Sequence, residues 1–250
     1  MRLALMSDIH SNLQALEACL RHARAQQAQR LGFLGDLVGY GGNPAQVVDR
    51  IMLLTEEGAF AIKGNHDAMA VRPPTQATTV GDTSALWTHQ QLSAQQRDWL
   101  DSLPLTHHLE KLLLVHASLN QPEQWRYVTD ERSAGASLDA AAAWPGVRYV
   151  LGGHVHEQTL YYRGATQGLM KFAPQAGIAI AVPAHRHWLG TVGSVGQPRD
   201  GKSEAMYALV DTERAQLTFH RVPYDHPAAA RAIVQAGLPA QFATRLEVGR

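Results

Sequence analysis

Five short segments of the sequence combine aspartate, histidine and asparagine, side chains that bind divalent metal ions through oxygen and nitrogen. In chain order they are SDIH (7–10), GDLVGYGG (35–42), GNHD (64–67), His116 and GGHVH (152–156). Each follows an apolar run that is typical of a buried strand. The carboxyl ends of strands meet at one edge of an open α/β sheet, and ligands bind there. We therefore expect one site that draws on all five segments.

The number and type of these side chains indicate two metal ions rather than one. A structural zinc site is satisfied by four ligands, usually rich in cysteine, whereas these segments contain no cysteine and about twice as many donors. A carboxylate can bridge two ions about 3.5 to 4 Å apart, and a water shared between them becomes hydroxide near neutral pH. Asp36 is the predicted bridge. The candidate donors are Asp8, His10, Asp36, Asn65, His66, His116, His154 and His156.

The GGHVH segment is expected to serve both ions. Its GHVH part alternates like a strand or a tight turn, so the backbone can direct His154 and His156 at different ions. Gly152 and Gly153 allow the chain to approach its neighbours closely.

The apolar runs of the first third of the chain alternate with helical patterns. A capping box of Ser11 and Gln14 predicts that one helix starts at Ser11. Asn43 and the proline after it predict a second helix that runs to about Glu57. Together with the predicted strands, this β-α-β-α-β order indicates a parallel sheet with helices on its faces. These strands are expected at 2–6, 31–34 and 59–63.

The rest of the chain predicts a different order of elements, with mainly antiparallel strands instead of alternating strands and helices. A helical stretch at 83–101, split near Leu92, precedes a hairpin at 107–116 and a strand at 148–151, and a helix at 225–239 closes the chain. Short runs between glycine and proline clusters indicate mainly antiparallel strands. We therefore expect one domain over residues 1–250, an α/β fold with two packed mixed β-sheets flanked by helices. The short runs are QTLYY, IAIAV, MYALV and QLTFHRV.

The composition limits what the protein is expected to bind. Lysine plus arginine and aspartate plus glutamate number 22 each, so the net charge provides no general attraction to nucleic acid or an anionic membrane. The one cysteine, Cys19, lies on the apolar face of the first predicted helix, which indicates a core residue rather than a nucleophile. The N-terminus lacks a secretory pattern, and no apolar run reaches about 18 to 20 residues. We expect a cytoplasmic protein without a membrane partner.

The five segments resemble, in order, the motifs of the calcineurin-like metallophosphoesterases: D-x-H, G-D, G-N-H-[DE], a single histidine and G-H-x-H. The later segment TVGSVGQPRDGKSEAMYALVD (191–211) resembles the closing segment of small prokaryotic members that are often described as phosphodiesterases or diadenosine tetraphosphatases. The resemblance implies an α/β/β/α sandwich. The matching residues are Asp8 with His10, Gly35 with Asp36, GNHD (64–67), His116 and GHVH (153–156).

The resemblance also implies a role for each donor. His66 would stabilise or protonate the leaving oxygen, and Asp67 would orient the His66 ring. The bridging hydroxide would attack phosphorus in line, while both ions neutralise the phosphoryl oxygens. Mixed oxygen and imidazole donors accept manganese, which is expected first, and also iron, zinc, cobalt or nickel. One ion would be held by Asp8, His10, Asp36 and His156, and the other by Asp36, Asn65, His116 and His154.

One departure from related enzymes bears on the substrate. Serine/threonine protein phosphatases of this superfamily carry an arginine just after the G-D motif, whereas this chain has none there until Arg50. Without that bidentate clamp, a small phosphodiester or a nucleotide is expected rather than a phosphoprotein. Contacts to the substrate are expected from Tyr40, Trp87, His89 and Arg199.

Two classes of function remain open at this point. One is a metal-dependent phosphoesterase of the phosphodiesterase or dinucleoside polyphosphate hydrolase class. The other is a catalytically silent relative that binds a nucleotide or a protein with the same surface. The joint presence of His66, Asp67 and every ligand position favours catalysis. A hydrolase of the metallo-β-lactamase type is not supported, because its H-x-H-x-D-H cluster is absent from the sequence.

Overall fold

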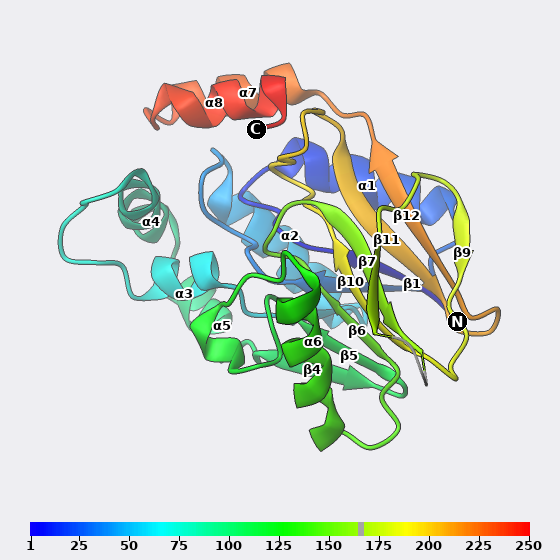
Figure 1. The fold of residues 1–250 in the computed structure, drawn as a ribbon. Coiled ribbons are helices and arrows are strands. Elements are labelled where there is room, and N and C mark those ends of the chain that lie inside the picture. The colour runs from blue at the N-terminus through cyan, green and yellow to red at the C-terminus, as the bar shows by residue number, and fades with distance from the viewer. Residues whose placement is uncertain (165–167) are drawn as a thin grey trace.

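The computed structural model describes residues 1–164 and 168–250. Over these ranges the chain forms two six-stranded β-sheets that pack face to face, with helices on their outer faces (Figure 1). The expected α/β fold with two packed mixed sheets is confirmed.

The first sheet contains the three parallel strands that the N-terminal apolar runs predict. In order across the sheet, its strands are β3 (Phe60–Ile62), β2 (Arg30–Leu34), β1 (Arg2–Met6), β11 (Ala205–Asp211), β12 (Gln216–Val222) and β9 (Ala179–Ala181). The strands β1, β2 and β3 run parallel to one another, whereas β11, β12 and β9 each run antiparallel to their neighbours. The C-terminal strands thus extend the N-terminal parallel sheet.

The second sheet is also mixed. In order, its strands are β4 (Thr106–Leu109), β5 (Leu112–Val115), β6 (Tyr149–Gly152), β10 (His187–Val192), β7 (Gln158–Arg163) and β8 (Leu169–Phe172). The central strands β5, β6 and β10 run parallel, and the outer strands pair antiparallel. The sequence analysis did not predict β8 or β10. It expected mainly antiparallel pairing in this part of the chain, whereas β10 pairs with β6 in parallel.

Helices cover both outer faces and complete four layers. The helices α1 (Leu13–Ala25) and α2 (Pro44–Glu56) pack on the first sheet, and α6 (Glu131–Ala140) packs on the second (Figure 1). A separate apolar cluster fills the space between the sheets. The order of layers is therefore helix, sheet, sheet, helix.

Alternating side chains of the strands fill these layers. In β5, Leu112 and Leu114 join the cluster between the sheets, whereas Leu113 and Val115 pack under α6. This is the period of two that a strand with both faces buried requires. Cys19 is buried on the inner side of α1, as predicted.

The remaining helices lie near the end of the sheets that carries the polar segments. The predicted helical stretch is divided into α4 (Val80–Gln91) and α5 (Ala94–Ser102), and α3 (Asn65–Val71) precedes them. At the C-terminus, α7 (His226–Gln235) and α8 (Ala240–Val248) pack on each other (Figure 1). The sequence analysis did not predict α3, α6 or α8. Within the described part of the chain, none of the helices combines the length and apolar character that a membrane crossing requires.

The capping residue of α1 was predicted one residue too early, at Ser11 instead of Asn12. Asn12 is the N-cap, and its side-chain oxygen accepts a hydrogen bond from the backbone N–H of Ala15 at 3.0 Å. Ser11 instead has a left-handed backbone (φ 54°). Its N–H donates to the carbonyl of Leu37, and its carbonyl accepts from Asn43. Ser11 is therefore part of the loop that ties two polar segments together.

Candidate metal centre

The five polar segments lie at the carboxyl ends of β1, β2, β3, β5 and β6. Three of these strands run parallel in the first sheet and two in the second. Backbone hydrogen bonds connect the segments: the N–H of Asp8 donates to Gly35, that of His10 donates to Asp36, and that of Gly153 donates to His116. The packing of the two sheets therefore brings all five segments to one edge.

A first group of metal-capable side chains comprises Asp8, His10 and His156. Their ligand atoms all lie within 4.8 Å of one another, and all three residues are buried. The Oδ1 atom of Asp8 lies 3.1 Å from Nε2 of His156 and 3.8 Å from Nε2 of His10. The two Nε2 atoms are 3.1 Å apart.

A second buried group comprises Asp36, His116 and His154. The Nε2 atom of His116 lies 3.3 Å from Oδ2 of Asp36 and 3.2 Å from Nδ1 of His154. The side-chain oxygen of Asn65 lies 3.2 Å from the same nitrogen, so Asn65 adds a fourth donor. The two histidines of the GHVH segment thus face different groups.

Asp36 lies between the two groups. Its Oδ2 atom, 3.3 Å from Nε2 of His116, is also 3.9 Å from Nε2 of His10. Its other oxygen accepts a hydrogen bond from the N–H of His66 at 2.8 Å, which fixes the carboxylate. One carboxylate oxygen is thus within reach of both groups.

Backbone carbonyl groups set the tautomers of three rings. In each ring Nδ1 faces a main-chain oxygen, so it carries the proton and leaves the lone pair of Nε2 free for a metal. The pairs, with their N–O distances, are His10 with Val38 (3.2 Å), His156 with Gln197 (2.6 Å) and His116 with Leu34 (2.7 Å).

The close contacts among these donor atoms are favourable only when a positive charge lies between them. The Nε2 lone pairs of His10 and His156 face each other at 3.1 Å and repel unless a positive charge lies between them. Burial lowers the pKa of His116, but the carboxylates of Asp36 and Asp8 outweigh burial and raise this pKa to about 10. A site that holds a proton so firmly also attracts a metal cation, because the same negative charges act on both.

Unusual backbone geometry marks the same residues. A left-handed backbone is rare outside glycine and concentrates at functional sites, although Asp, Asn and His adopt it more readily than other residues. The close approach of the segments also depends on Gly64, where a Cβ would lie 2.2 Å from the backbone nitrogen and Oδ1 of Asp36. The candidate ligands with positive φ are Asp8, His10, Asp36, His154 and His156.

Comparison with known proteins agrees with this geometry. The model of the calcineurin-like phosphoesterase superfamily domain matches residues 1–215. The chain belongs to this superfamily. Its members are generally hydrolases that use divalent metal ions. The family resemblance read from the five motifs is therefore confirmed.

Three similar proteins are informative. An uncharacterized protein of Methanocaldococcus jannaschii is 30% identical over 254 residues, covering 99% of this chain and 98% of that protein. The crystal structure of a metallophosphoesterase from Sphaerobacter thermophilus matches with a TM-score of 0.87 and 31% identity, covering 100% of this chain and 99% of that one. A symmetrical bis(5'-nucleosyl)-tetraphosphatase of Nitrosococcus oceani is 32% identical over 151 residues, 57% of this chain and 51% of that protein.

His66 lies beside the first group of this phosphoesterase domain but outside both groups. Its ring centroid is 5.1 Å from that of His10 and 4.4 Å from that of Tyr40, and the residue is 8% exposed. Burial lowers the pKa of His66, whereas the Asp36 carboxylate acts in the opposite direction. The net effect is a lowered pKa for a ring that lies close to the two groups.

The expectation that Asp67 orients the His66 ring is wrong in this structure. The Nδ1 atom of His66 is buried without a hydrogen-bond partner in the described residues 1–164 and 168–250. One oxygen of Asp67 accepts the N–H groups of Leu37 and Val38, and the other accepts that of Gly64. Burial raises the pKa of Asp67 to about 7, although these N–H groups oppose the shift. Asp67 thus joins the second polar segment to the third.

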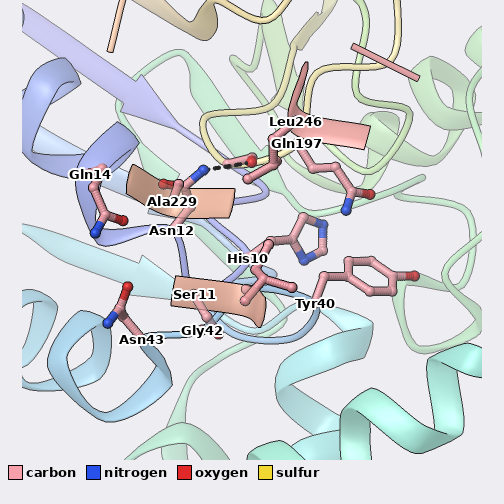
Figure 2. A pocket seen from close by; sticks show the side chains of 13 residues that line it. His10, Ser11, Asn12, Gln14, Tyr40, Gly42, Asn43, Gln197, Ala229 and Leu246 are labelled. Carbon is pink, nitrogen blue, oxygen red and sulfur yellow. Dashed lines mark hydrogen bonds between the residues drawn. The ribbon is translucent and has the colours of Figure 1, made fainter. Parts of the chain in front are cut away.

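Tyr40, expected to contact the substrate, lies against the first group, and Arg199, expected in the same role, lies beside Tyr40. The rings of Tyr40 and His10 lie next to each other (Figure 2), with centroids 4.8 Å apart. The guanidinium carbon of Arg199 is 6.0 Å from the centroid of the Tyr40 ring. The backbone N–H of Arg199 donates to the carbonyl of His156. A cation and a phenol therefore flank this side of the site.

Trp87 and His89, also expected as substrate contacts, make structural contacts. Trp87 packs against the cluster formed by α7 and α8. The Nδ1 atom of His89 forms a hydrogen bond with the carbonyl of Ala70 in α3 at 2.7 Å. Neither contact directs a ring at the two metal-capable groups, so we do not include these residues in the proposed site.

A narrow cavity behind His10 is too small for a substrate. Its volume is about 10 Å³, enough for about one water. Asn12 crosses it and donates to the carbonyl of Gly196 at 2.9 Å, and α7 and α8 close it with Ala229 and Leu246 (Figure 2). A phosphoester therefore has to approach the groups from another side.

A larger opening lies beside the second group and was not predicted from the sequence. A cavity of about 520 Å³ is lined by Asn65, Arg72, Trp125, Tyr127 and His154, among others. The ring of Tyr127 stacks on His154, with centroids 4.0 Å apart and an interplanar angle of 24°. Two aromatic residues at 125 and 127, shortly after the metal-capable His116, were the available signal in the sequence.

Proposed function

We propose that this protein is a phosphoesterase that depends on two divalent metal ions and hydrolyses a phosphodiester or a nucleotide phosphate. The observation that supports it most directly is the pair of buried ligand groups with Asp36 between them. The similarity to a bis(5'-nucleosyl)-tetraphosphatase over 57% of the chain supports a nucleotide substrate. The dinucleoside polyphosphates are thus one class to be tested.

The proposed ligand sets follow the two groups. When bound, divalent ions lower the pKa of a nearby water and neutralise charge on phosphoryl oxygens. The donors are carboxylate and amide oxygens together with imidazole nitrogens, and we propose manganese as the native metal because it accepts this mixture. The first set is Asp8, His10, Asp36 and His156, and the second is Asp36, Asn65, His116 and His154.

The neighbouring side chains have distinct roles in this proposal. His66 gives a proton to the departing oxygen, because its ring lies against His10 and is not held by another hydrogen-bonding side chain among the described residues. Arg199 and the hydroxyl of Tyr40 bind phosphate oxygens on the same side. The low exposure of His66 keeps bulk water from competing for that proton.

The decisive experiment compares leaving groups in the His66→Ala variant. We expect this variant to retain two metals by elemental analysis. It should lose about 100-fold or more in kcat on an alkyl ester, where the leaving oxygen needs a proton, and much less on a 4-nitrophenyl ester. His185→Ala, which removes an exposed histidine, is the matched control. Equal losses on both esters with intact metal content would exclude the acid role.

A second measurement distinguishes the enzyme from a catalytically silent relative. His156→Ala and His116→Ala each remove a donor from a different group, so each should lower the bound metal and abolish hydrolysis. If the wild-type protein with two bound ions hydrolyses none of the phosphomonoesters, aryl phosphodiesters, cyclic nucleotides and dinucleoside polyphosphates, the hydrolase proposal fails. Binding without turnover would then identify a nucleotide-binding module.

A further inference from the structure

The cavity beside the second metal-capable group has one wall made by a single face of α3 and by the residue that caps this helix. Positions 65, 68 and 69 are three and four residues apart, so their side chains point to the same side of the helix, and Arg72 follows the helix as its C-cap. The catalytic candidate His66 lies on the buried face of α3 instead. The residues of the wall are Asn65, Ala68, Met69 and Arg72.

The opposite wall is a loop with two aromatic side chains. Gln121 and Trp125 have left-handed backbones (φ 59° and 52°) on either side of the short 3-10 turn Pro122–Gln124. The N–H of Ser118 donates to the carbonyl of Arg126 and ties the loop to the end of β5. This geometry places both Trp125 and Tyr127 on the cavity.

The aromatic rings are close to the second group yet accessible. Tyr127 covers the His154 ring with one face, while 55% of the residue remains exposed. The rings of Trp125 and His116 form a T-shaped pair, with centroids 5.9 Å apart and an interplanar angle of 70°. Arg72, whose side chain is 72% exposed, pairs with Asp101 at the rim. A large exposed aromatic beside a buried polar site is typical of a ligand-binding surface.

We propose that this cavity binds the nucleobase of a nucleotidyl phosphoester whose phosphate lies at the two metal-capable groups. Trp125 and Tyr127 supply the stacking surfaces, and the planar guanidinium of Arg72 borders the same space. The cavity volume of about 520 Å³ is in the range of small-molecule sites. This inference rests on the proposed function, since the metals hold the phosphate. It narrows the substrate class from phosphoesters in general to nucleotides.

Two ligands that differ only in the base test the proposal. Adenosine 5′-monophosphate and ribose 5-phosphate are titrated by isothermal calorimetry into the metal-loaded protein. We expect the nucleotide to bind about tenfold more tightly, because an aromatic ring that stacks on a base contributes about 5-fold to 150-fold in affinity. Trp125→Ala and Tyr127→Ala should each remove most of the difference in affinity between the two ligands. Trp125→Phe should retain it.

The controls separate a base pocket from a structural loop. Trp144→Phe alters a tryptophan that packs near α6 and should behave as the wild type. Equal affinities of the wild type for the two ligands would overturn the inference, and so would an equal loss for both ligands in Trp125→Ala. If the wild type binds the nucleotide preferentially but hydrolyses no ester, the base pocket is supported and the proposed hydrolysis is refuted. Hydrolysis without base preference would support the proposed hydrolysis and overturn the base pocket.

Discussion

The Gly153→Ala substitution tests whether the Asp8 carboxylate belongs to a metal group. A Cβ at position 153 would lie 1.9 Å from Oγ of Ser7 and 2.3 Å from Oδ2 of Asp8. An ordinary contact needs about 3.4 Å, so the carboxylate has to move by about 1 Å. The same Oδ2 atom accepts the N–H of His154 at 2.9 Å. The movement therefore breaks this hydrogen bond and displaces Oδ1 from Nε2 of His156, now 3.1 Å away.

The magnitude of the effect follows from this overlap. Overpacking a buried site costs about 1–3 kcal/mol of unfolding free energy. For a chain of this length, that lowers the Tm by about 5 °C. Disturbing the groups around a metal typically lowers its affinity about 10–100-fold. We therefore expect Gly153→Ala to retain one tightly bound ion rather than two after dialysis, as measured by elemental analysis, together with the lower Tm in the metal-free form.

The matched control is Gly81→Ala in α4. A Cβ at that position would meet only Oγ1 of Thr79 at 3.5 Å, an ordinary contact, so metal content and activity should not change. If Gly153→Ala binds two ions with wild-type affinity, the assignment of Asp8 as a ligand is refuted. A lower Tm with both ions still bound would confirm the tight packing and refute only the ligand role.

Two further predictions concern groups away from the site. Burial lowers the pKa of His220 to about 4, and the charges of His22 and Arg2 act in the same direction. Above this pH the unfolded chain binds a proton at His220 more readily than the folded protein does, so the folded protein becomes less stable as the pH falls. Between about pH 7.5 and pH 5, the free energy of unfolding of the wild type, measured by urea denaturation, should fall by about 2 kcal/mol because of this residue. The His220→Gln variant should lack this loss. If the free energies of the two proteins fell in parallel with pH, the prediction would be contradicted. Burial also raises the pKa of the Cys19 thiol, so a thiol reagent such as DTNB should react with it only after unfolding. Rapid labelling of the folded protein would contradict this and show that α1 opens.

The strands that carry the site were predictable because each of them is buried on both faces. The continuous apolar run of β5 distinguishes it from an amphipathic helix by its short length and the hairpin before it. Once such strands are placed in parallel, the polar residues after them have to meet at one edge. Asp8, Asp36 and His116 were therefore brought together correctly by reasoning that used no distance information.

The missed elements lack these local signals. The strand β10 contains Gly190, whose missing side chain leaves room for Leu151 of β6; a Cβ there would lie 2.9 Å from the leucine. Its position in the sheet depends on contacts with distant strands rather than on its own pattern. The helix α3 has only 7 residues, about two turns, which is too short to establish a period. The direction of Trp125 depends on a left-handed backbone, which propensity does not predict for tryptophan.

Both metal-capable groups draw on both sheets. In the first group, Asp8 and His10 follow a strand of one sheet, and His156 follows a strand of the other. In the second group, Asp36 follows a strand of the first sheet, and His116 and His154 follow strands of the second. Neither ligand set is complete until the sheets have packed, because each set takes donors that follow strands of both sheets. A cation bound at either group therefore stabilises the packed state in which its ligands meet. This explains why the ligands are spread over about 150 residues of the sequence, and why the packed core between the sheets is as necessary for the proposed chemistry as the ligands themselves.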